Sequence, residues 1–179
     1  MEFEFLDHRP IIVAIAGPNG AGKTTFYQAH LADTGLRYIN ADDLARELNM
    51  GPYEAAEAAN ALRHALVARR ESFIFETVFS DPVGDKVQFL HDAVGLGYQV
   101  VLIFIRINDL ETSIQRVSMR VAQGGHDVPD EKLQSRFERT LENLQRAIDR
   151  LPHVLIFDNS DLSQSFQHVA TWRDGEMVE

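Results

Sequence analysis

One eight-residue motif constrains this chain more than any other feature. Gly17-Pro18-Asn19-Gly20-Ala21-Gly22-Lys23-Thr24 follows the pattern G-x-x-x-x-G-K-[ST] without exception. It lies between a continuous apolar run, Ile11–Ala16, and a helical pattern that begins at Lys23, which is the context that a phosphate-binding loop requires. The glycines let successive backbone N–H groups face one concavity, and the following helix adds its positive end. We therefore expect residues 17–25 to hold the phosphates of a nucleoside triphosphate.

Each part of this loop has an expected partner. Lys23 would place its charge on the β and γ phosphates of ATP, and the Thr24 hydroxyl would bind Mg²⁺, with Thr25 next to it. The alternative is a glycine-rich turn that binds nothing, or a dinucleotide loop of the G-x-G-x-x-G kind. Lys-Thr after the last glycine is not needed for turning, and G-x-G-x-x-G has a different spacing, so both alternatives are weaker.

Short apolar runs alternate with helical patterns along the rest of the chain. The runs after Ile11–Ala16 are Arg37–Asn40, which is the weakest, Ser72–Phe75, Gln99–Ile105 and Val154–Phe157. Helical patterns cover residues 23–31, 53–70, 83–94, 110–121 and 133–151. This alternation predicts parallel strands covered on both faces. We expect one domain over residues 1–179, an α/β/α three-layer sandwich of the P-loop NTPase kind, with a five-stranded parallel sheet in the order 2-3-1-4-5.

Composition excludes several classes of protein. The formal net charge of −10 argues against nucleic acid as the main partner, because phosphate-backbone surfaces carry excess Lys and Arg. The absence of cysteine excludes disulfides and thiolate metal sites. The first ten residues lack the pattern of a signal peptide, and no apolar run approaches the roughly 20 residues that span a bilayer. We expect a cytoplasmic protein that does not bind membranes.

Carboxylates follow two of the predicted strands, at the sheet edge where open α/β sheets bind ligands. Asp42 is the first candidate for the base that accepts a proton from an acceptor hydroxyl. Its alternative, shared with Asp43, is to cap a helix at residues 44–48. Glu76, next to Thr77, would hold Mg²⁺ through water or bind the acceptor hydroxyl. The alternative for Glu76 is a solvated carboxylate at a strand end.

Two amphipathic helical patterns carry arginines beside their apolar stripes. Arg116 and Arg120 lie on one face of the first, and Arg136 and Arg139 occur on the second. Folded across the turn at Gly124-Gly125, these helices would form a lid at about residues 109–140 that brings guanidinium groups to the transferred phosphoryl group. The alternative is that these arginines form surface ion pairs, for which Glu111, Glu131, Glu138 and Glu142 are available.

Two polar loops remain open. His126, in Gly-Gly-His-Asp-Val-Pro, would contact the substrate or the lid, or would simply be solvated. Asp158-Asn159-Ser160 follows the last predicted parallel strand and would line an adenine pocket or cap the next helix.

In their order along the chain, these motifs resemble the zeta toxin family of P-loop kinases. The resemblance rests on Gly17 to Thr24, Ile39-Asn40-Ala41-Asp42, Phe75-Glu76-Thr77, Arg116 to Arg120, the Gly124 to Pro129 loop and Arg136 to Leu144. It implies transfer of phosphate from ATP, with Mg²⁺, to a hydroxyl of UDP-N-acetylglucosamine or of another nucleotide or sugar metabolite, and an antitoxin protein as partner. This chain is shorter than classical zeta toxins, and Thr77 follows Glu76 directly where those toxins interpose a glycine.

The resemblance also implies roles for individual residues. Lys23 and Thr24 match the phosphate and Mg²⁺ ligands, and Asp42 matches the catalytic base. Glu76 and Thr77 match the acceptor-binding strand end. Arg120 and Arg136 match the lid arginines best, followed by Arg116.

Three functions therefore compete. The first is a kinase that phosphorylates a small molecule. The second is a nucleotide-gated ATPase or switch that binds a protein partner, which needs an exposed interaction surface. The third is a nucleic-acid-end kinase, which the net charge of −10 disfavours.

Overall fold

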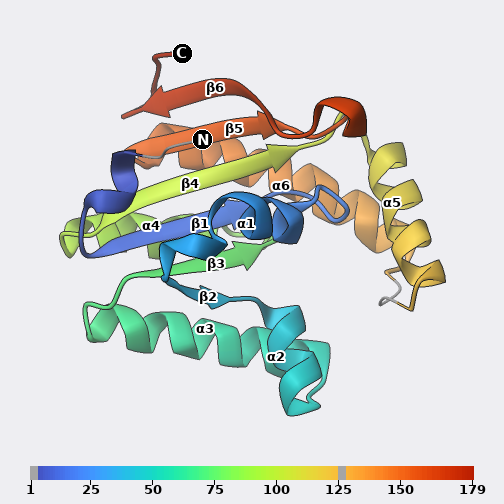
Figure 1. The fold of residues 1–179 in the computed structure, drawn as a ribbon, viewed down its shortest axis with the longest axis horizontal. Coiled ribbons are helices and arrows are strands. Elements are labelled where there is room, and N and C mark those ends of the chain that lie inside the picture. The colour runs from blue at the N-terminus through green and yellow to red at the C-terminus, as the bar shows by residue number, and fades with distance from the viewer. Residues whose placement is uncertain (1–3, 125–127) are drawn as a thin grey trace.

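The computed structural model describes residues 4–124 and 128–179, which build one sheet with helices on both of its faces (Figure 1). The strands are β1 (Ile11–Ala16), β2 (Arg37–Ile39), β3 (Phe73–Thr77), β4 (Gln99–Arg106), β5 (His153–Asp158), β6 (Gln167–Arg173) and β7 (Glu176–Met177). The α-helices are α1 (Lys23–His30), α2 (Ala41–Leu48), α3 (Pro52–Ala68), α4 (Asp85–Gly95), α5 (Leu110–Ala122) and α6 (Asp130–Arg150). Single 3₁₀ turns occur at Glu4–Asp7, Ala32–Thr34 and Leu162–Gln164.

The sheet order is β2-β3-β1-β4-β5-β6-β7. The first five strands are parallel and follow the predicted order 2-3-1-4-5. The predicted number of five strands is wrong, because β6 and β7 extend the sheet in antiparallel orientation beyond β5. The three-layer arrangement of the P-loop NTPase kind is confirmed.

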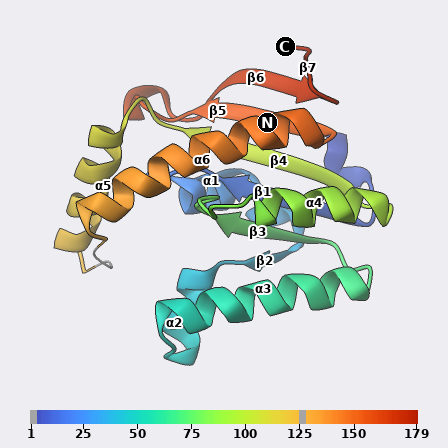
Figure 2. The ribbon, with the colours of Figure 1, turned by 180° about the vertical axis from the view of Figure 1, so that it is seen from behind.

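Alternation along the central strands assigns the helices to the two faces. In β1 every residue is fully buried, as expected for a strand covered on both sides. Ile12, Ala14 and Ala16 face a cluster that includes residues of α3, α4 and α6. Ile11, Val13 and Ile15 face the opposite cluster, to which α1 contributes Phe26. Figure 1 shows α1 in front of the sheet, and Figure 2 shows α3, α4 and α6 in front of the other face.

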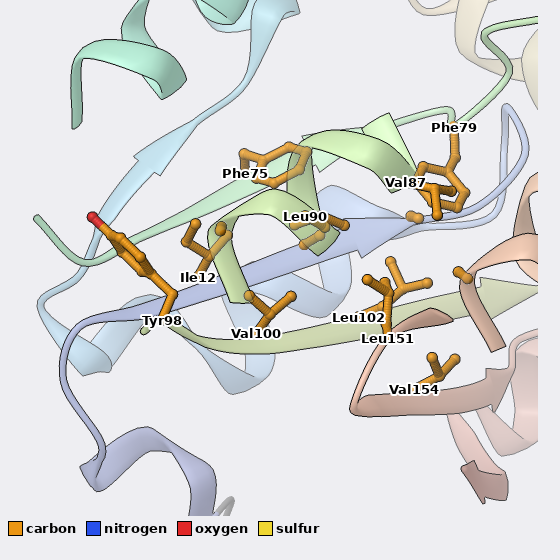
Figure 3. Packing of buried hydrophobic residues seen from close by; sticks show 14 of the residues in the cluster. Ile12, Phe75, Phe79, Val87, Leu90, Tyr98, Val100, Leu102, Leu151 and Val154 are labelled. Atoms are coloured by element: carbon orange, nitrogen blue, oxygen red, sulfur yellow. The ribbon is translucent and has the colours of Figure 1, made fainter. Parts of the chain in front are cut away.

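Large apolar side chains fill the α3, α4 and α6 face. Figure 3 shows Leu90 of α4 among Ile12, Phe75, Val100 and Leu102 of the three central strands. All five side chains are fully buried. Burying a side chain of this size stabilises the fold by about 1.5–3 kcal/mol. This packing fixes the positions at which the parallel strands end, and therefore the edge from which the polar side chains project.

Helix α2 begins one residue before the predicted carboxylate pair. Asn40 is its N-cap, and the Asn40 Oδ1 atom accepts a hydrogen bond from the Asp42 backbone N–H at 2.9 Å. The alternative that Asp42 or Asp43 caps this helix is therefore wrong. Asp43 instead accepts a hydrogen bond of 2.6 Å from Arg46 one turn later. The Asp42 carboxylate is left exposed at the start of the helix.

Helix α5 and the first part of α6 stand beyond the ends toward which β1, β3 and β4 point (Figures 1 and 2). The second half of α6 packs on the sheet through Ala147 and Ile148, so the helix connects the core to this end of the molecule. Gly125, His126 and Asp127 lie outside the described residues, and the role predicted for His126 stays a prediction. In the described parts of the chain, no helix combines the length and the apolar character needed to cross a bilayer.

Candidate functional site

The loop between β1 and α1 has a backbone that only glycine can adopt at two positions. Gly17 has φ of +149°, and a Cβ atom there would lie 2.2 Å from the carbonyl oxygen of Ile105. Gly22 has φ of +93°, and its Cβ would lie 2.6 Å from the Asn159 side-chain nitrogen. A side chain at Gly17 would force the backbone to move, and one at Gly22 would be strained by the positive φ and would displace the Asn159 amide. The glycines of the motif therefore serve the shape of the loop.

Side chains distant in sequence hold this loop from behind. The Asn159 Nδ2 atom donates to the Ala21 carbonyl at 2.8 Å, and the Ser113 hydroxyl donates to the Asn19 carbonyl at 2.7 Å. Arg116 donates to the Ser160 carbonyl at 2.9 Å and to the Gly20 carbonyl at 3.4 Å. These contacts tie the loop to α5 and to the segment after β5. Because the loop carbonyls point toward α5 and the segment after β5, the N–H groups of the loop are directed toward its opposite side.

Lys23 is buried at the first turn of α1. Its side chain is 7% exposed, and the Nζ atom donates to the carbonyls of Gly17 at 2.9 Å and Pro18 at 3.1 Å. Burial lowers the pKa of Lys23, while the carboxylates of Glu76 and Asp42 raise it. The ammonium group is thus positioned against the loop backbone, with two carboxylates in its electrostatic surroundings.

Glu76 forms the centre of a hydrogen-bond cluster at the end of β3. Its Oε2 atom accepts hydrogen bonds from the Thr24 hydroxyl at 2.9 Å and the Asn40 amide at 3.3 Å, and also from the Tyr38 hydroxyl. Burial and the Glu76 carboxylate raise the pKa of Tyr38, so this phenol stays a donor. Tyr38 stacks on Tyr27 at 3.6 Å between ring centroids. The alternative that Glu76 is a solvated strand-end carboxylate is wrong.

The Thr24 and Glu76 oxygens fit the way in which proteins hold Mg²⁺. This ion takes one or two protein oxygens and completes its shell with water and phosphate oxygens. Among the described residues, no group of three or more His, Asp or Glu side chains forms a metal cage. A hydroxyl and a carboxylate 2.9 Å apart beside a phosphate loop are consistent with a phosphate-bound magnesium ion.

A cavity of about 1010 Å³ opens beside the loop and α1. Of the residues predicted from the sequence, its walls include Asn19, Lys23, Asp42, Glu76, Thr77, Arg120 and Arg136. Arg116 does not line it, and points instead to the Gly20 and Ser160 carbonyls behind the loop. Asn19 and Lys23 line this space together with the predicted base and acceptor-binding residues, whereas Thr24 and the other loop residues are not part of its wall. The individual roles stay predictions.

Helices α5 and α6 contribute the positive side of this cavity. Arg120 comes from α5, and α6 supplies Lys132, Arg136 and Arg139. The surface ion pairs considered for the four arginines do not form: in the described parts of the chain, no carboxylate lies within 4 Å of Arg116, Arg120, Arg136 or Arg139. The Nε atom of Arg139 is buried without a hydrogen-bond partner. Cations that lie beside a phosphate loop without a carboxylate partner fit an anionic ligand.

The loop after β3 forms part of the cavity wall, and hydrogen bonds from α6 hold it. Asn143 is 1% exposed, and its Nδ2 atom donates to the carbonyls of Phe79 at 2.9 Å and Asp81 at 2.8 Å. The Thr140 hydroxyl donates to the Val78 carbonyl at 2.8 Å. Helix α6 therefore positions both its own cations and the wall that carries Thr77.

Replacing Asn143 with alanine tests this connection. We expect Asn143→Ala to lower the free energy of unfolding by about 2–3 kcal/mol, because one buried and one partly buried carbonyl lose their donor. Urea denaturation measures the change. Gln145→Ala, which removes an exposed hydrogen bond to Asp149 on the same helix, is the control and should change stability by less than about 0.5 kcal/mol. Equal effects of the two substitutions would contradict the role of Asn143.

Several supporting residues escaped prediction. Tyr38 and Asn40 on the β2 side, and Ser113 on α5, make contacts that join segments far apart in the sequence. Asn159 was predicted to line an adenine pocket or to cap a helix. It supports the phosphate loop, the next short helix is capped by Asp161, and the adenine pocket stays a prediction. Asp158, its neighbour, accepts a hydrogen bond from the Ser160 N–H at 2.7 Å, as in a local turn. The sequence identifies a polar residue at the end of a strand, but it does not identify the distant residue with which that side chain forms a hydrogen bond.

Comparisons with known proteins agree with this geometry. The family model described as zeta toxin matches residues 5–168. An uncharacterized protein of Haemophilus influenzae is 27% identical over 126 residues, which cover 68% of this chain and 88% of that protein.

Two solved structures share the fold at lower identity. One is an AvrRxo1-ORF1:AvrRxo1-ORF2 complex with ATP, with a TM-score of 0.69 and 20% identity over 97% of this chain. The chain spans 62% of the length of that solved chain. The other comes from the PezAT chromosomal toxin-antitoxin system of Streptococcus pneumoniae, with a TM-score of 0.64 and 18% identity over 91% of this chain and 72% of that one. At these identities the likeness shows the fold.

Proposed function

The chain belongs to the zeta toxin family, and on that premise we propose that it transfers the terminal phosphoryl group of ATP to a hydroxyl of a small-molecule acceptor. One observation carries the proposal: Lys23, Asp42 and Glu76 line the same cavity of about 1010 Å³, and α5 and α6 add cations to it. A cavity of this size can hold a triphosphate together with a metabolite.

The residues divide the work of phosphoryl transfer. N–H groups of the loop and the Lys23 ammonium bind the phosphates, and the Thr24 hydroxyl and the Glu76 carboxylate are the groups that would hold Mg²⁺. When bound, Mg²⁺ neutralises charge on the phosphate oxygens. Asp42 accepts the proton of the acceptor hydroxyl while the hydroxyl oxygen forms a bond to the γ-phosphorus. The bond between the γ-phosphorus and the β–γ bridging oxygen breaks, which releases ADP. Thr77 and Glu76 border the acceptor.

The arginines act on the charge that spreads over the transferred group. Arg120 and Arg136 line the cavity and are suited to bind phosphoryl oxygens directly. Arg116, which holds the Gly20 carbonyl, would act by keeping the loop in shape. We propose that α5 and the first part of α6 form the lid, within residues 109–140, which closes over the bound substrates.

The identity of the acceptor and the partner extends the proposal. UDP-N-acetylglucosamine, or another nucleotide or sugar metabolite, is the acceptor class that the family suggests. The PezAT relative is described as part of a toxin-antitoxin system, so we propose an antitoxin protein as a partner of this chain as well. We place the reaction in the cytoplasm, where ATP and such metabolites occur together.

Labelled ATP tests the proposed function. The protein is incubated with [γ-³²P]ATP, Mg²⁺ and a small-molecule extract, and products are separated by chromatography. We expect label in a small organic phosphate. Label in inorganic phosphate alone would favour a nucleotide-gated switch, and label on an added oligonucleotide would favour a nucleic-acid-end kinase. Either of these two results would contradict the proposal.

A further inference from the structure

Helix α3 buries an arginine on the face that packs against the sheet. Ala55, Ala59 and Leu66 are buried on this helix, and Arg63 lies among them with only 6% of its surface exposed. Residues 55, 59 and 63 are each four apart, so they share one face. An apolar side chain would satisfy this position in a helix that served packing alone.

The guanidinium group of Arg63 has little to compensate its charge. Its Nη2 atom donates to the Asn60 side-chain oxygen at 3.0 Å, and its Cζ atom lies 4.9 Å from the centre of the Phe75 ring. Within residues 4–124 and 128–179, no carboxylate approaches it to 4 Å. Burial lowers the pKa of Arg63 to about 10. It still carries its charge at neutral pH. Within the part of the chain that the structure describes, its guanidinium group contacts a neutral amide and an aromatic ring.

Such an arrangement costs stability in the unliganded protein. Buried charges are normally paired with an opposite charge, because the free-energy cost of removing a charge from water otherwise exceeds the stabilisation that neutral contacts provide. A guanidinium group has five N–H donors in a planar fork. Asn60 uses one of them, and the fork is shaped to bind a carboxylate or phosphate through two parallel hydrogen bonds.

Arg63 lines the same cavity as the candidate base. It lies at the end between α3 and α4, where Asn60, His64 and Phe89 are also part of the wall. Phe75, which stacks on Arg63, directly precedes Glu76 in β3. Lys86 also borders this cavity, but it lies 3.6 Å from the Asp81 carboxylate, so its charge is already compensated. Arg63 is therefore suited to bind an anion at this end.

We propose that Arg63 is an anion subsite for the acceptor, and that the acceptor carries a carboxylate or phosphate group in addition to the hydroxyl that is phosphorylated. This inference rests on the proposed kinase function, because the bound anion is called an acceptor only if the protein transfers a phosphoryl group to it. The anion lies against the α3–α4 wall, and the hydroxyl faces Asp42. Arg63 thereby selects anionic metabolites over neutral ones of similar size.

Titration with small anions tests the subsite without any turnover. The protein is first saturated with Mg²⁺ and a non-hydrolysable ATP analogue, so that the phosphate loop is filled, and is then titrated calorimetrically with inorganic phosphate and, separately, with malonate. We expect Arg63→Met to weaken binding of the preferred anion by about 10- to 100-fold, as for loss of a charged hydrogen bond. Phosphate binding better than malonate indicates a phosphorylated acceptor, and the reverse order indicates a carboxylic acid.

Two variants and a stability readout complete this test. Arg69→Met removes an exposed cation at the end of α3 and should leave anion binding unchanged. Arg63→Lys keeps the charge but not the fork, and should bind the anion with intermediate affinity. The melting temperature of Arg63→Met should stay equal or rise, because an unpaired buried charge is removed. Unchanged anion binding in Arg63→Met and Arg63→Lys would overturn the subsite.

The transfer assay separates failure of the subsite from failure of the kinase. Metabolites are divided into anionic and neutral fractions before labelling. Label that enters only a neutral acceptor, equally in wild type and Arg63→Met, overturns the subsite and leaves the kinase intact. Anion binding that depends on Arg63 supports the subsite even if no fraction is labelled, whereas the kinase would then be contradicted.

Discussion

Asp42→Asn is expected to lower kcat for phosphoryl transfer by about 10²- to 10⁴-fold, which is the usual contribution of a positioned general base. The substitution keeps the size of the side chain and removes its ability to accept a proton. Asp42 is exposed at the start of α2, and Asn40 caps the helix through the Asp42 N–H, so the fold does not depend on the carboxylate. Binding of the ATP analogue should remain close to wild type.

Asp43→Asn is the matched control for this prediction. Asp43 is the next residue of the same helix, it pairs with Arg46 at 2.6 Å, and it does not line the cavity. We expect its kcat to stay within about twofold of wild type, since surface pairs of this kind contribute little. If both variants lost activity equally, the effect would come from α2 as a whole, and Asp42 would not be the base.

The second large effect is expected from Lys23→Met. Lys23 is 7% exposed, and methionine retains much of its apolar stem while removing the ammonium group that lies against the phosphate loop. We expect kcat/KM for ATP to fall by about 10²- to 10³-fold, as when one preorganised donor to a transition state is lost. Steady-state kinetics at varied ATP concentration measure the change.

Stability must be followed alongside, because Lys23 also donates to the Gly17 and Pro18 carbonyls. A melting temperature within a few degrees of wild type shows that the loop survives. Arg37→Met removes an exposed cation paired loosely with Glu71 at the start of β2 and serves as the control for charge. Wild-type kcat/KM in Lys23→Met would mean that the loop does not bind the triphosphate in the proposed way.

The centre of the parallel sheet was predictable because β1, β3 and β4 are largely buried on both faces. Such strands appear in the sequence as short continuous apolar runs, and the helical patterns between them require crossover connections. Strands β6 and β7 were missed for the opposite reason. Gln167–Arg173 is an antiparallel strand near the sheet edge in which every residue is exposed or half-buried, so its sequence carries no continuous apolar run.

The site residues that could be predicted are those for which the residue type and its position in a motif are enough to assign the residue to the site. The sequence locates the start of the helix at Lys23 and the strand ends near Asp42 and Glu76. Parallel strands bring these positions to one edge of the sheet, where all three residues line the cavity. Arg63 was not found, because the helical spacing of α3 was traced through Ala58, Leu62, Ala65 and Leu66, although Ala65 is exposed. The buried face of α3 combines alanines with an arginine, so it can be identified as the buried face only when the position of the sheet is known.

The central claim is that the γ-phosphate and an acceptor hydroxyl meet at Asp42 inside one cavity. Its most direct test is the partition of ³²P between an organic product and inorganic phosphate in a single turnover of wild type, Asp42→Asn and Asp43→Asn. We predict organic product from wild type and Asp43→Asn, and almost none from Asp42→Asn. Label that passes only to inorganic phosphate, at the same rate in all three proteins, would contradict the account.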